Sequence, residues 1–287
     1  MPLTSSDLVA SWWTIAGAAP GSHARWSIAQ RAAAAARAGF AGIGLRADDY
    51  TIARESGLSD ADIAASIRDS GLVLDEIEFV TGWSSDDPAQ QERGRRIEAD
   101  LYALADAVGV RQLNVGCIEP LGSLPPLEAV VQRFAALCER AATHGLQVAL
   151  EFMPWTGIPG AALAWEIVRL AGAPNGGVLV DTWHYFRGAA DPSQLRAIPV
   201  DRILGIQIND AGREVIGSLR DDSLHRRRLP GEGSFDLQGF VRLIDELGVA
   251  APIAIEVISD EQSALPLDEA ARRAFETTTA VLSRARS

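Results

Sequence analysis

Short apolar segments alternate with longer amphipathic segments along almost the whole chain. Eight of the apolar segments have the length and composition of buried strands, and a helical spacing of apolar positions follows most of them. The expected strands are residues 9–16, 42–46, 73–80, 112–116, 147–153, 177–181, 203–208 and 253–258. The expected helices are residues 27–38, 60–70, 88–108, 125–144, 161–171, 192–197, 237–247 and 267–284. Strands that alternate with helices in this way predict a parallel sheet.

Residues that commonly cap helices stand at these limits. Ser59 and Asp87 stand where helix N-caps are expected, and glycines such as Gly39 and Gly248 follow helical patterns where left-handed C-caps are common. Eight strand–helix units in 287 residues fit a closed (β/α)8 or TIM barrel, and no linker interrupts the sequence, so we expect one α/β domain over residues 1–287. A doubly wound open sheet is the alternative, but residues 12–20 lack its glycine-rich phosphate-binding pattern.

The composition excludes several classes of function. A net charge of -12 argues against a nucleic-acid partner, because such binding depends on neutralising phosphates. No apolar run is long enough to span a membrane and the N-terminus lacks a basic signal start, so we expect a cytoplasmic protein without a membrane partner. All 26 basic residues are arginine. The absence of lysine excludes Schiff-base, pyridoxal-phosphate and P-loop lysine chemistry.

Acidic side chains stand at the C-terminal ends of the later strands, where a barrel of this kind gathers its active site. Glu151, Asp181 and Glu256 each interrupt an apolar run at a corresponding place, and Gln207 holds that place on the seventh strand. Carboxylates this close would repel one another, and a divalent cation removes the conflict. The pattern therefore predicts a metal site. The alternative is that each acid pairs with an arginine from a loop, for which the candidates are Arg46, Arg187, Arg213 and Arg228.

Other polar residues at the strand ends are candidates for binding a substrate. His184 lies one turn past Asp181 and is expected to hydrogen bond a substrate, although a lone histidine can also be structural. Arg228 lies in the arginine run before Pro230-Gly231 and is expected to grip a substrate anion or oxyanion. Asn114 lies on the fourth strand, and Glu78 on the third is either a substrate contact or a member of a structural ion pair.

Tryptophans recur near the ends of the expected strands. Such rings could form the flat apolar walls on which the C–H faces of a sugar pack, or they could simply fill the barrel mouth. The residues concerned are Trp13, Trp83, Trp155 and Trp183.

These motifs resemble those of the xylose isomerase-like barrel superfamily, and within it the sugar phosphate isomerase/epimerase family. The resemblance in strand and helix order covers nearly the whole chain. The stretches that carry it are Leu-Glu-Phe at 150–152, Asp-Thr-Trp-His at 181–184, Gln-Ile-Asn-Asp at 207–210, Leu-Pro-Gly-Glu-Gly at 229–233 and Ile-Glu at 255–256.

The resemblance implies a metal held by Glu151, Asp181, Gln207 and Glu256, with Glu151 and Glu256 also acting as the acid/base pair and His184 contacting substrate oxygens. The usual family ligand on the seventh strand is histidine, and Gln207 in its place gives an all-oxygen set. Such a set favours one Mn²⁺ or Mg²⁺ ion over Zn²⁺. A homodimer or homotetramer is also expected from the resemblance.

The implied activity is that of a divalent-metal-dependent isomerase or epimerase of a sugar, keto-sugar or cyclitol. It would remove a proton next to a metal-bound carbonyl to give an enediolate. A lyase or dehydratase of the same family, acting on a keto-sugar, inosose or dehydroshikimate-like substrate, is the alternative. Two less favoured hypotheses are an abasic-site endonuclease and a non-catalytic sugar-binding subunit. The negative charge and the presence of only four histidines argue against the endonuclease.

Overall fold

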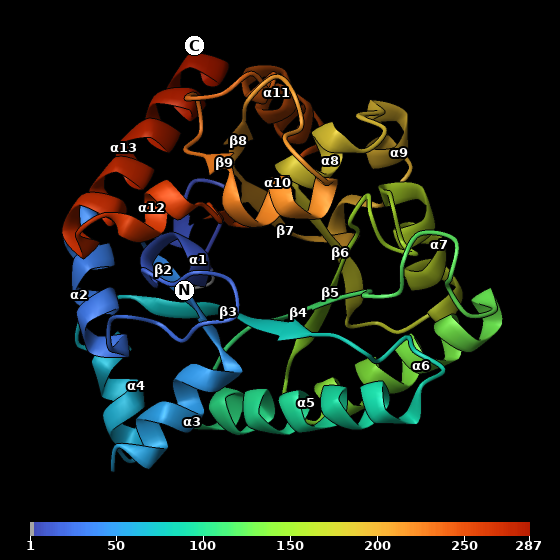
Figure 1. Ribbon diagram of the computed structural model, residues 1–287, viewed down its shortest axis with the longest axis horizontal. Coiled ribbons are helices and arrows are strands. Elements are labelled where there is room, and N and C mark those ends of the chain that lie inside the picture. Colours follow the sequence, from blue (N-terminus) through green and yellow to red (C-terminus); the bar gives the residue numbers. More distant parts are fainter. Residues whose placement is uncertain (1–2) are drawn as a thin grey trace.

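A ring of parallel strands forms the centre of the molecule (Figure 1). The computed structural model describes residues 3–287, so the first two residues of the expected domain lie outside it. Within the described residues the strands close a barrel in the order β1-β10-β7-β6-β5-β4-β3-β2. The strands are β1 (Leu8–Ala10), β2 (Gly42–Arg46), β3 (Val73–Val80), β4 (Gln112–Gly116), β5 (Gln147–Glu151), β6 (Gly176–Asp181), β7 (Ile203–Ile208) and β10 (Ile253–Ile255). The expected (β/α)8 barrel is confirmed.

The expected helices surround this ring. They are α2 (Ile28–Ala38), α4 (Asp60–Arg68), α5 (Pro88–Val108), α6 (Leu127–Ala142), α7 (Ala161–Ala171), α9 (Pro192–Arg196), α11 (Leu237–Leu247) and α13 (Leu267–Arg286). The last helix, α13, packs against both α2 and α11, so the first and last of these helices lie side by side and close the outer layer (Figure 1). None of the helices within residues 3–287 combines the length and hydrophobicity needed to cross a bilayer.

The first and last barrel strands are shorter than the apolar pattern predicts. β1 ends at Ala10 and is followed by the helical turn α1 (Trp12–Ile15), so the prediction of a strand to residue 16 was wrong. Thr14 in this turn donates its hydroxyl to the Ile255 carbonyl and accepts the amide of Val257. These bonds replace the strand pairing that would have continued β1 and β10.

Several short elements on the side of the strand ends were not predicted. They are α3 (Ala47–Glu55), α8 (Thr182–Arg187), α10 (Leu219–His225), α12 (Asp260–Ala264) and the antiparallel pair β8 (Asp210–Ala211) and β9 (Arg227–Arg228). The 3₁₀ turn η1 (Val200–Arg202), which leads into the start of β7, was not predicted either. Most are too short to show a helical or strand period of their own.

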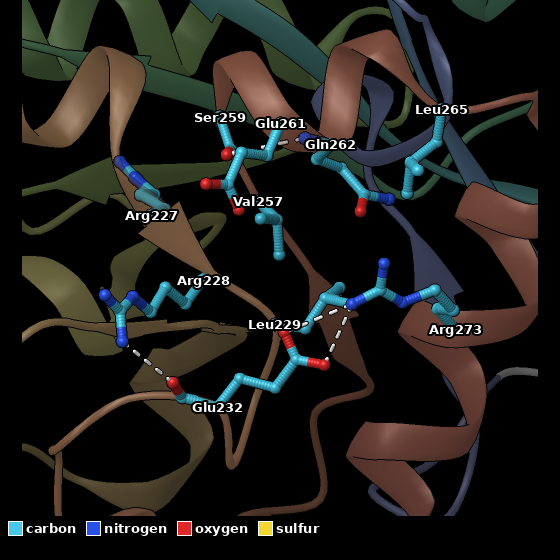
Figure 2. Close-up of a pocket in the computed structure, with 10 residues that line it drawn as sticks. All are labelled: Arg227, Arg228, Leu229, Glu232, Val257, Ser259, Glu261, Gln262, Leu265 and Arg273. Carbon is cyan, nitrogen blue, oxygen red and sulfur yellow. Dashed lines mark hydrogen bonds and ion pairs between the residues drawn. The ribbon is translucent and has the colours of Figure 1, made fainter.

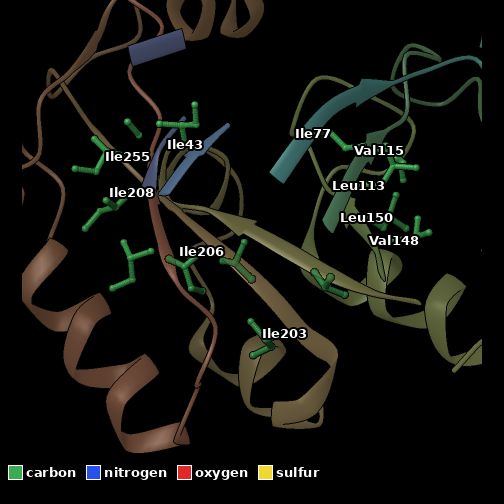
Figure 3. Packing of buried hydrophobic residues seen from close by; sticks show 14 of the residues in the cluster. Ile43, Ile77, Leu113, Val115, Val148, Leu150, Ile203, Ile206, Ile208 and Ile255 are labelled. Atoms are coloured by element: carbon green, nitrogen blue, oxygen red, sulfur yellow. The ribbon is translucent and has the colours of Figure 1, made fainter. Parts of the chain in front are cut away.

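The barrel strands carry apolar residues on the face toward the helices, and some of them carry polar residues on the face toward the barrel interior. Leu113 and Val115 belong to the large core between strands and helices, together with residues of the neighbouring strands (Figure 3). Gln112 and Asn114 point to the opposite face, where Gln112 donates to Asn114 and Asn114 donates to Glu76. The barrel interior below the site therefore contains a polar network beside the small apolar cluster of Ala149, Leu179 and Leu204. A glycine makes room for the network, since a Cβ at Gly205 would lie 2.6 Å from Gln112 Nε2.

Candidate active site

The residues predicted to hold a metal converge where four adjacent strands end. Glu151 is the last residue of β5 and Asp181 the last of β6, while Gln207 on β7 pairs in register with both Asp181 and Ala254. Glu256 follows β10 directly, and its amide donates to the Ile208 carbonyl. All four side chains are at least 94% buried. The parallel register thus brings together donors that lie far apart in the sequence.

Arg227 lies at the centre of this group. Its Nη1 atom is 2.7 Å from Oδ2 of Asp181 and 2.7 Å from Oε2 of Glu256. Ser223 holds the rest of the guanidinium, because its carbonyl accepts from Nε at 3.0 Å and its hydroxyl accepts from Nη2 at 3.0 Å. An arginine paired with the acids, the alternative to a metal site, is therefore present beside the donor set, but this arginine is Arg227 and none of the four predicted candidates.

The sequence feature that points to Arg227 is the run of arginines at residues 226–228. Arg227 and Arg228 form the two-residue strand β9, which pairs with β8 so that Ala211 opposes Arg227 and Asp210 opposes Arg228. Successive side chains of a strand point to opposite sides. Arg227 therefore faces the site and is 97% buried, whereas Arg228 is exposed and donates to the Glu232 carbonyl (Figure 2).

His184 lies on the helix that starts at Asp181. Its amide donates to Oδ1 of Asp181 at 3.0 Å, so the carboxylate serves as the N-cap of α8. On its ring, Nε2 lies 3.0 Å from Oε1 of Glu151 and 3.4 Å from Nη2 of Arg227, while Nδ1 has no partner. Glu151, Asp181 and His184 each offer a ligand atom within 4.8 Å of the others, which makes them a possible metal-binding cluster.

Gln207 presents one satisfied and one unsatisfied atom to this cluster. Its Nε2 donates to Oε1 of Glu256 at 3.2 Å, and its buried Oε1 has no hydrogen-bond partner. A buried acceptor without a donor is costly unless something else meets it. The free oxygen therefore fits a ligand role toward a cation.

Burial controls the protonation of the acids. It raises the pKa of Glu151 to about 8, with Asp181 adding to the rise, and it raises the pKa of Glu256 well above its usual range against the opposing effect of Arg227. Burial also disfavours the charged form of Asp181, but Arg227 and the His184 amide outweigh it and lower its pKa. For His184, burial and Arg227 lower the pKa to about 3, so its ring is neutral at pH 7.

A cavity of about 270 Å³ opens above these residues. Glu151, Glu256, His184 and Arg227 form its floor, and Trp13, Trp155 and Met153 are among its walls. Glu78 also lines it; this side chain is 98% buried, its Oε1 has no partner, and burial together with Glu256 raises its pKa well above the usual range. The polar floor and aromatic walls suit a small molecule rich in hydroxyl groups.

Three of the predicted substrate-binding residues lie outside the cavity lining. Trp183 is fully buried and packs edge-on against Trp155 and His184, so it supports the wall. Asn114 is fully buried within the barrel and donates to Glu76. Arg228 lines a separate cavity together with Glu232 and Arg273 (Figure 2). Arg46 lines the site cavity instead, with its guanidinium 5.1 Å from the Trp13 ring centre.

Comparison with known families agrees with this geometry. The model of the family described as xylose isomerase-like TIM barrel matches residues 32–280. Among solved structures, the IOLI protein with a binding zinc atom superposes with a TM-score of 0.85 at 19% identity, covering 97% of this chain and 99% of that one. At this identity the likeness concerns the fold alone.

Two kinds of curated enzyme match part of the chain. A 3-dehydroshikimate dehydratase from Pseudomonas aeruginosa is 34% identical over 131 residues, which are 45% of this chain and 20% of the relative. An inosose isomerase from Halalkalibacterium halodurans is 29% identical over 150 residues, which are 52% of each chain. The matched region thus spans about a fifth of the dehydratase and about half of the isomerase.

Proposed function

This chain belongs to the xylose isomerase-like TIM barrel family, and from that premise we propose that it is a divalent-metal-dependent isomerase or epimerase of a small polyhydroxylated ketone. The reaction would begin with removal of a proton from the carbon next to the carbonyl. The observation that carries the proposal is the convergence of Glu151 and Glu256 on one cavity beside Asp181 and the free oxygen of Gln207.

The donor set fits a divalent cation. Glu151, Asp181, Gln207 and Glu256 offer oxygen atoms only, which suits Mn²⁺ or Mg²⁺ better than Zn²⁺. A cation held by these residues would polarise a substrate carbonyl and stabilise the negative charge that develops on its oxygen. We assign His184 to the substrate, because four donors are present without it and its ring lines the cavity.

The two glutamates are placed to move protons. Glu151 on β5 and Glu256 after β10 are separated in the barrel by β6 and β7, so they can meet a substrate from different sides. One carboxylate accepts the proton and the other carboxylic acid returns one. Return to the opposite face of the same carbon gives epimerisation, and return to the neighbouring carbon gives isomerisation.

The cavity favours a substrate of about one ring. Its volume of about 270 Å³ lies just below the range for small-molecule sites, about 300 to 1,000 Å³. Inosose, named in one group of relatives, is a cyclic ketone that carries several hydroxyl groups. Such a ring could pack its C–H groups on Trp13 and Trp155 while His184 and Glu78 hydrogen bond its hydroxyls.

A dehydratase is the second candidate, favoured by the 34% identity to the 3-dehydroshikimate dehydratase. After the same proton removal, the hydroxyl group of the next carbon would leave as water with a proton from the second glutamic acid, and no proton would return to carbon. This reaction creates a conjugated double bond, so the two candidates differ in the ultraviolet absorbance of their products.

The test uses Mn²⁺-loaded protein in D₂O with inosose, D-fructose and 3-dehydroshikimate as probes. Nuclear magnetic resonance should show deuterium entering the carbon next to a carbonyl, and absorbance should detect dehydration. Glu151→Gln and Glu256→Gln should each slow the reaction by about 10²- to 10⁴-fold, the scale of general acid–base catalysis. Glu232→Gln, an exposed glutamate outside the site cavity, should leave it unchanged. Full exchange in both site variants would refute the acid/base assignment.

A further inference from the structure

Arg227 and a metal ion would compete for the same carboxylate oxygens. Oδ2 of Asp181 already accepts hydrogen bonds from Asn209 Nδ2 at 2.8 Å and from Arg227 Nη1 at 2.7 Å. Since a carboxylate oxygen has two lone-pair directions, both are used. A cation that takes this oxygen must displace one of the two donors.

Electrostatics selects Arg227 as the donor that leaves. Nη1 is 2.7 Å from both Asp181 and Glu256, and a metal ion binds such oxygens at about 2.1 to 2.6 Å. The guanidinium and the ion would then lie within about 5 Å of each other in a buried site, where two cations repel strongly. Asn209 carries no charge and meets no such repulsion.

The site cavity offers space into which the guanidinium of Arg227 can move. Arg227 lines the site cavity, and Ser223 anchors its Nε and Nη2 atoms from the side of α10. Because the guanidinium is a rigid plane, Nη1 leaves the carboxylates only when the whole group tilts, giving up at least one of its bonds to Ser223, toward the open space above them. Its N–H groups then face the place where substrate oxygens would lie.

We propose that Arg227 is an internal counter-ion that holds Asp181 and Glu256 in the metal-free protein and is released into the cavity when a divalent cation binds. Metal binding thereby completes the substrate site by freeing a hydrogen-bond donor. The inference rests on the proposed metal requirement, but it concerns the protein before any substrate is present.

The first experiment measures Mn²⁺ binding by calorimetry after dialysis against a chelator. Arg227→Met should bind Mn²⁺ more tightly than the wild type by about 10- to 100-fold, the scale on which neighbouring groups alter metal affinity. The metal-free variant should unfold at a lower temperature than the metal-free wild type, because two buried carboxylates have lost their partner. Mn²⁺ should therefore raise the unfolding temperature of the variant by more than that of the wild type. Arg228→Met removes the adjacent, exposed arginine and should change neither quantity.

Equal or weaker Mn²⁺ binding by Arg227→Met overturns the proposal, as does failure of every variant and the wild type to bind Mn²⁺. Should Arg227→Met not fold, Arg227→Gln keeps a neutral donor of similar reach and is expected to shift affinity in the same direction. A crystal structure with Mn²⁺ gives a second readout: Nη1 should move beyond hydrogen-bond distance of Asp181. Neither measurement uses a substrate, so failure of the deuterium assay and failure of this proposal remain distinguishable.

Discussion

Gln207 donates its Nε2 to Oε1 of Glu256 at 3.2 Å and thereby leaves its own Oε1 buried without a donor. The amide is thus oriented by the residue that follows the neighbouring strand β10, with its carbonyl oxygen left available. This arrangement bears directly on which metal the site prefers.

Replacing Gln207 with histidine should shift that preference toward zinc. An imidazole nitrogen in place of an amide oxygen suits Zn²⁺ better than Mn²⁺. We expect the ratio of Zn²⁺ to Mn²⁺ affinity to rise by about tenfold or more in Gln207→His, measured by competition with a chromogenic chelator. An unchanged ratio would show that residue 207 does not bind the ion. Gln112→His, one layer deeper in the barrel, is the control.

His184 should act on the substrate rather than on the metal. His184→Gln is expected to lower kcat/KM by about 100-fold through loss of a substrate hydrogen bond that strengthens in the transition state. Its metal content, measured by inductively coupled plasma spectrometry, should match the wild type. A variant that loses the metal would instead identify His184 as a ligand, together with Glu151 and Asp181.

Replacing Trp183 should mainly lower stability, whereas replacing Trp155 should mainly affect substrate binding. Trp183 is fully buried, so Trp183→Ala should reduce the free energy of unfolding by about 3 to 5 kcal/mol. Trp155 is half-buried and lines the cavity, so Trp155→Ala should cost less stability while raising KM. Urea unfolding and steady-state kinetics check the pair. Equal losses of stability would contradict the assignment of Trp155 to the cavity wall.

Glu76 should make the protein less stable as the pH rises. Burial raises its pKa from 4.5 to about 7, so between these values the unfolded chain releases a proton that the folded chain keeps. Stability is then lost across that interval, by about 3 kcal/mol in full, and stays lost above it. Glu76→Gln should therefore gain stability over the wild type as the pH rises from 4.5 to 8.

Urea unfolding at several pH values measures this difference. Glu166→Gln, an exposed glutamate on α7, is the control and should show no such trend. A constant difference between Glu76→Gln and the wild type at all pH values would show that Glu76 does not titrate in this interval.

The sequence was most informative where a strand meets the site. Asp181 ends its strand as expected, and Glu151 ends β5 two residues before the expected limit of residue 153. Both acids could be picked out because each interrupts an apolar run, which is visible without knowing its neighbours in space. The orientation of side chains beyond the strands could not be read in this way. Choosing Arg227 over Arg228 requires knowing that β9 pairs with β8, and two residues show no period.

The depth of a side chain along the barrel axis could not be predicted from the sequence either. Asn114 lies on the inward face of β4 like the site residues, yet it hydrogen bonds to Glu76 below the cavity. How far a side chain lies from the mouth depends on the stagger between strands, including the register shift between Ile43 and Gly44. Strand periodicity gives the face of a residue but not its height.

The N-cap of α8 limits how this enzyme could diverge. Asp181 is both a candidate ligand and the acceptor of the His184 amide, so the spacing of these two residues is set by one turn of helix. An insertion between them would break the cap and move the imidazole away from Glu151. Most positions of the segment from 212 to 226, which leads from β8 to β9, do not serve both as a candidate ligand and as a helix cap. Changes in substrate preference during evolution should therefore accumulate in that segment, while the interval from 181 to 184 keeps its length.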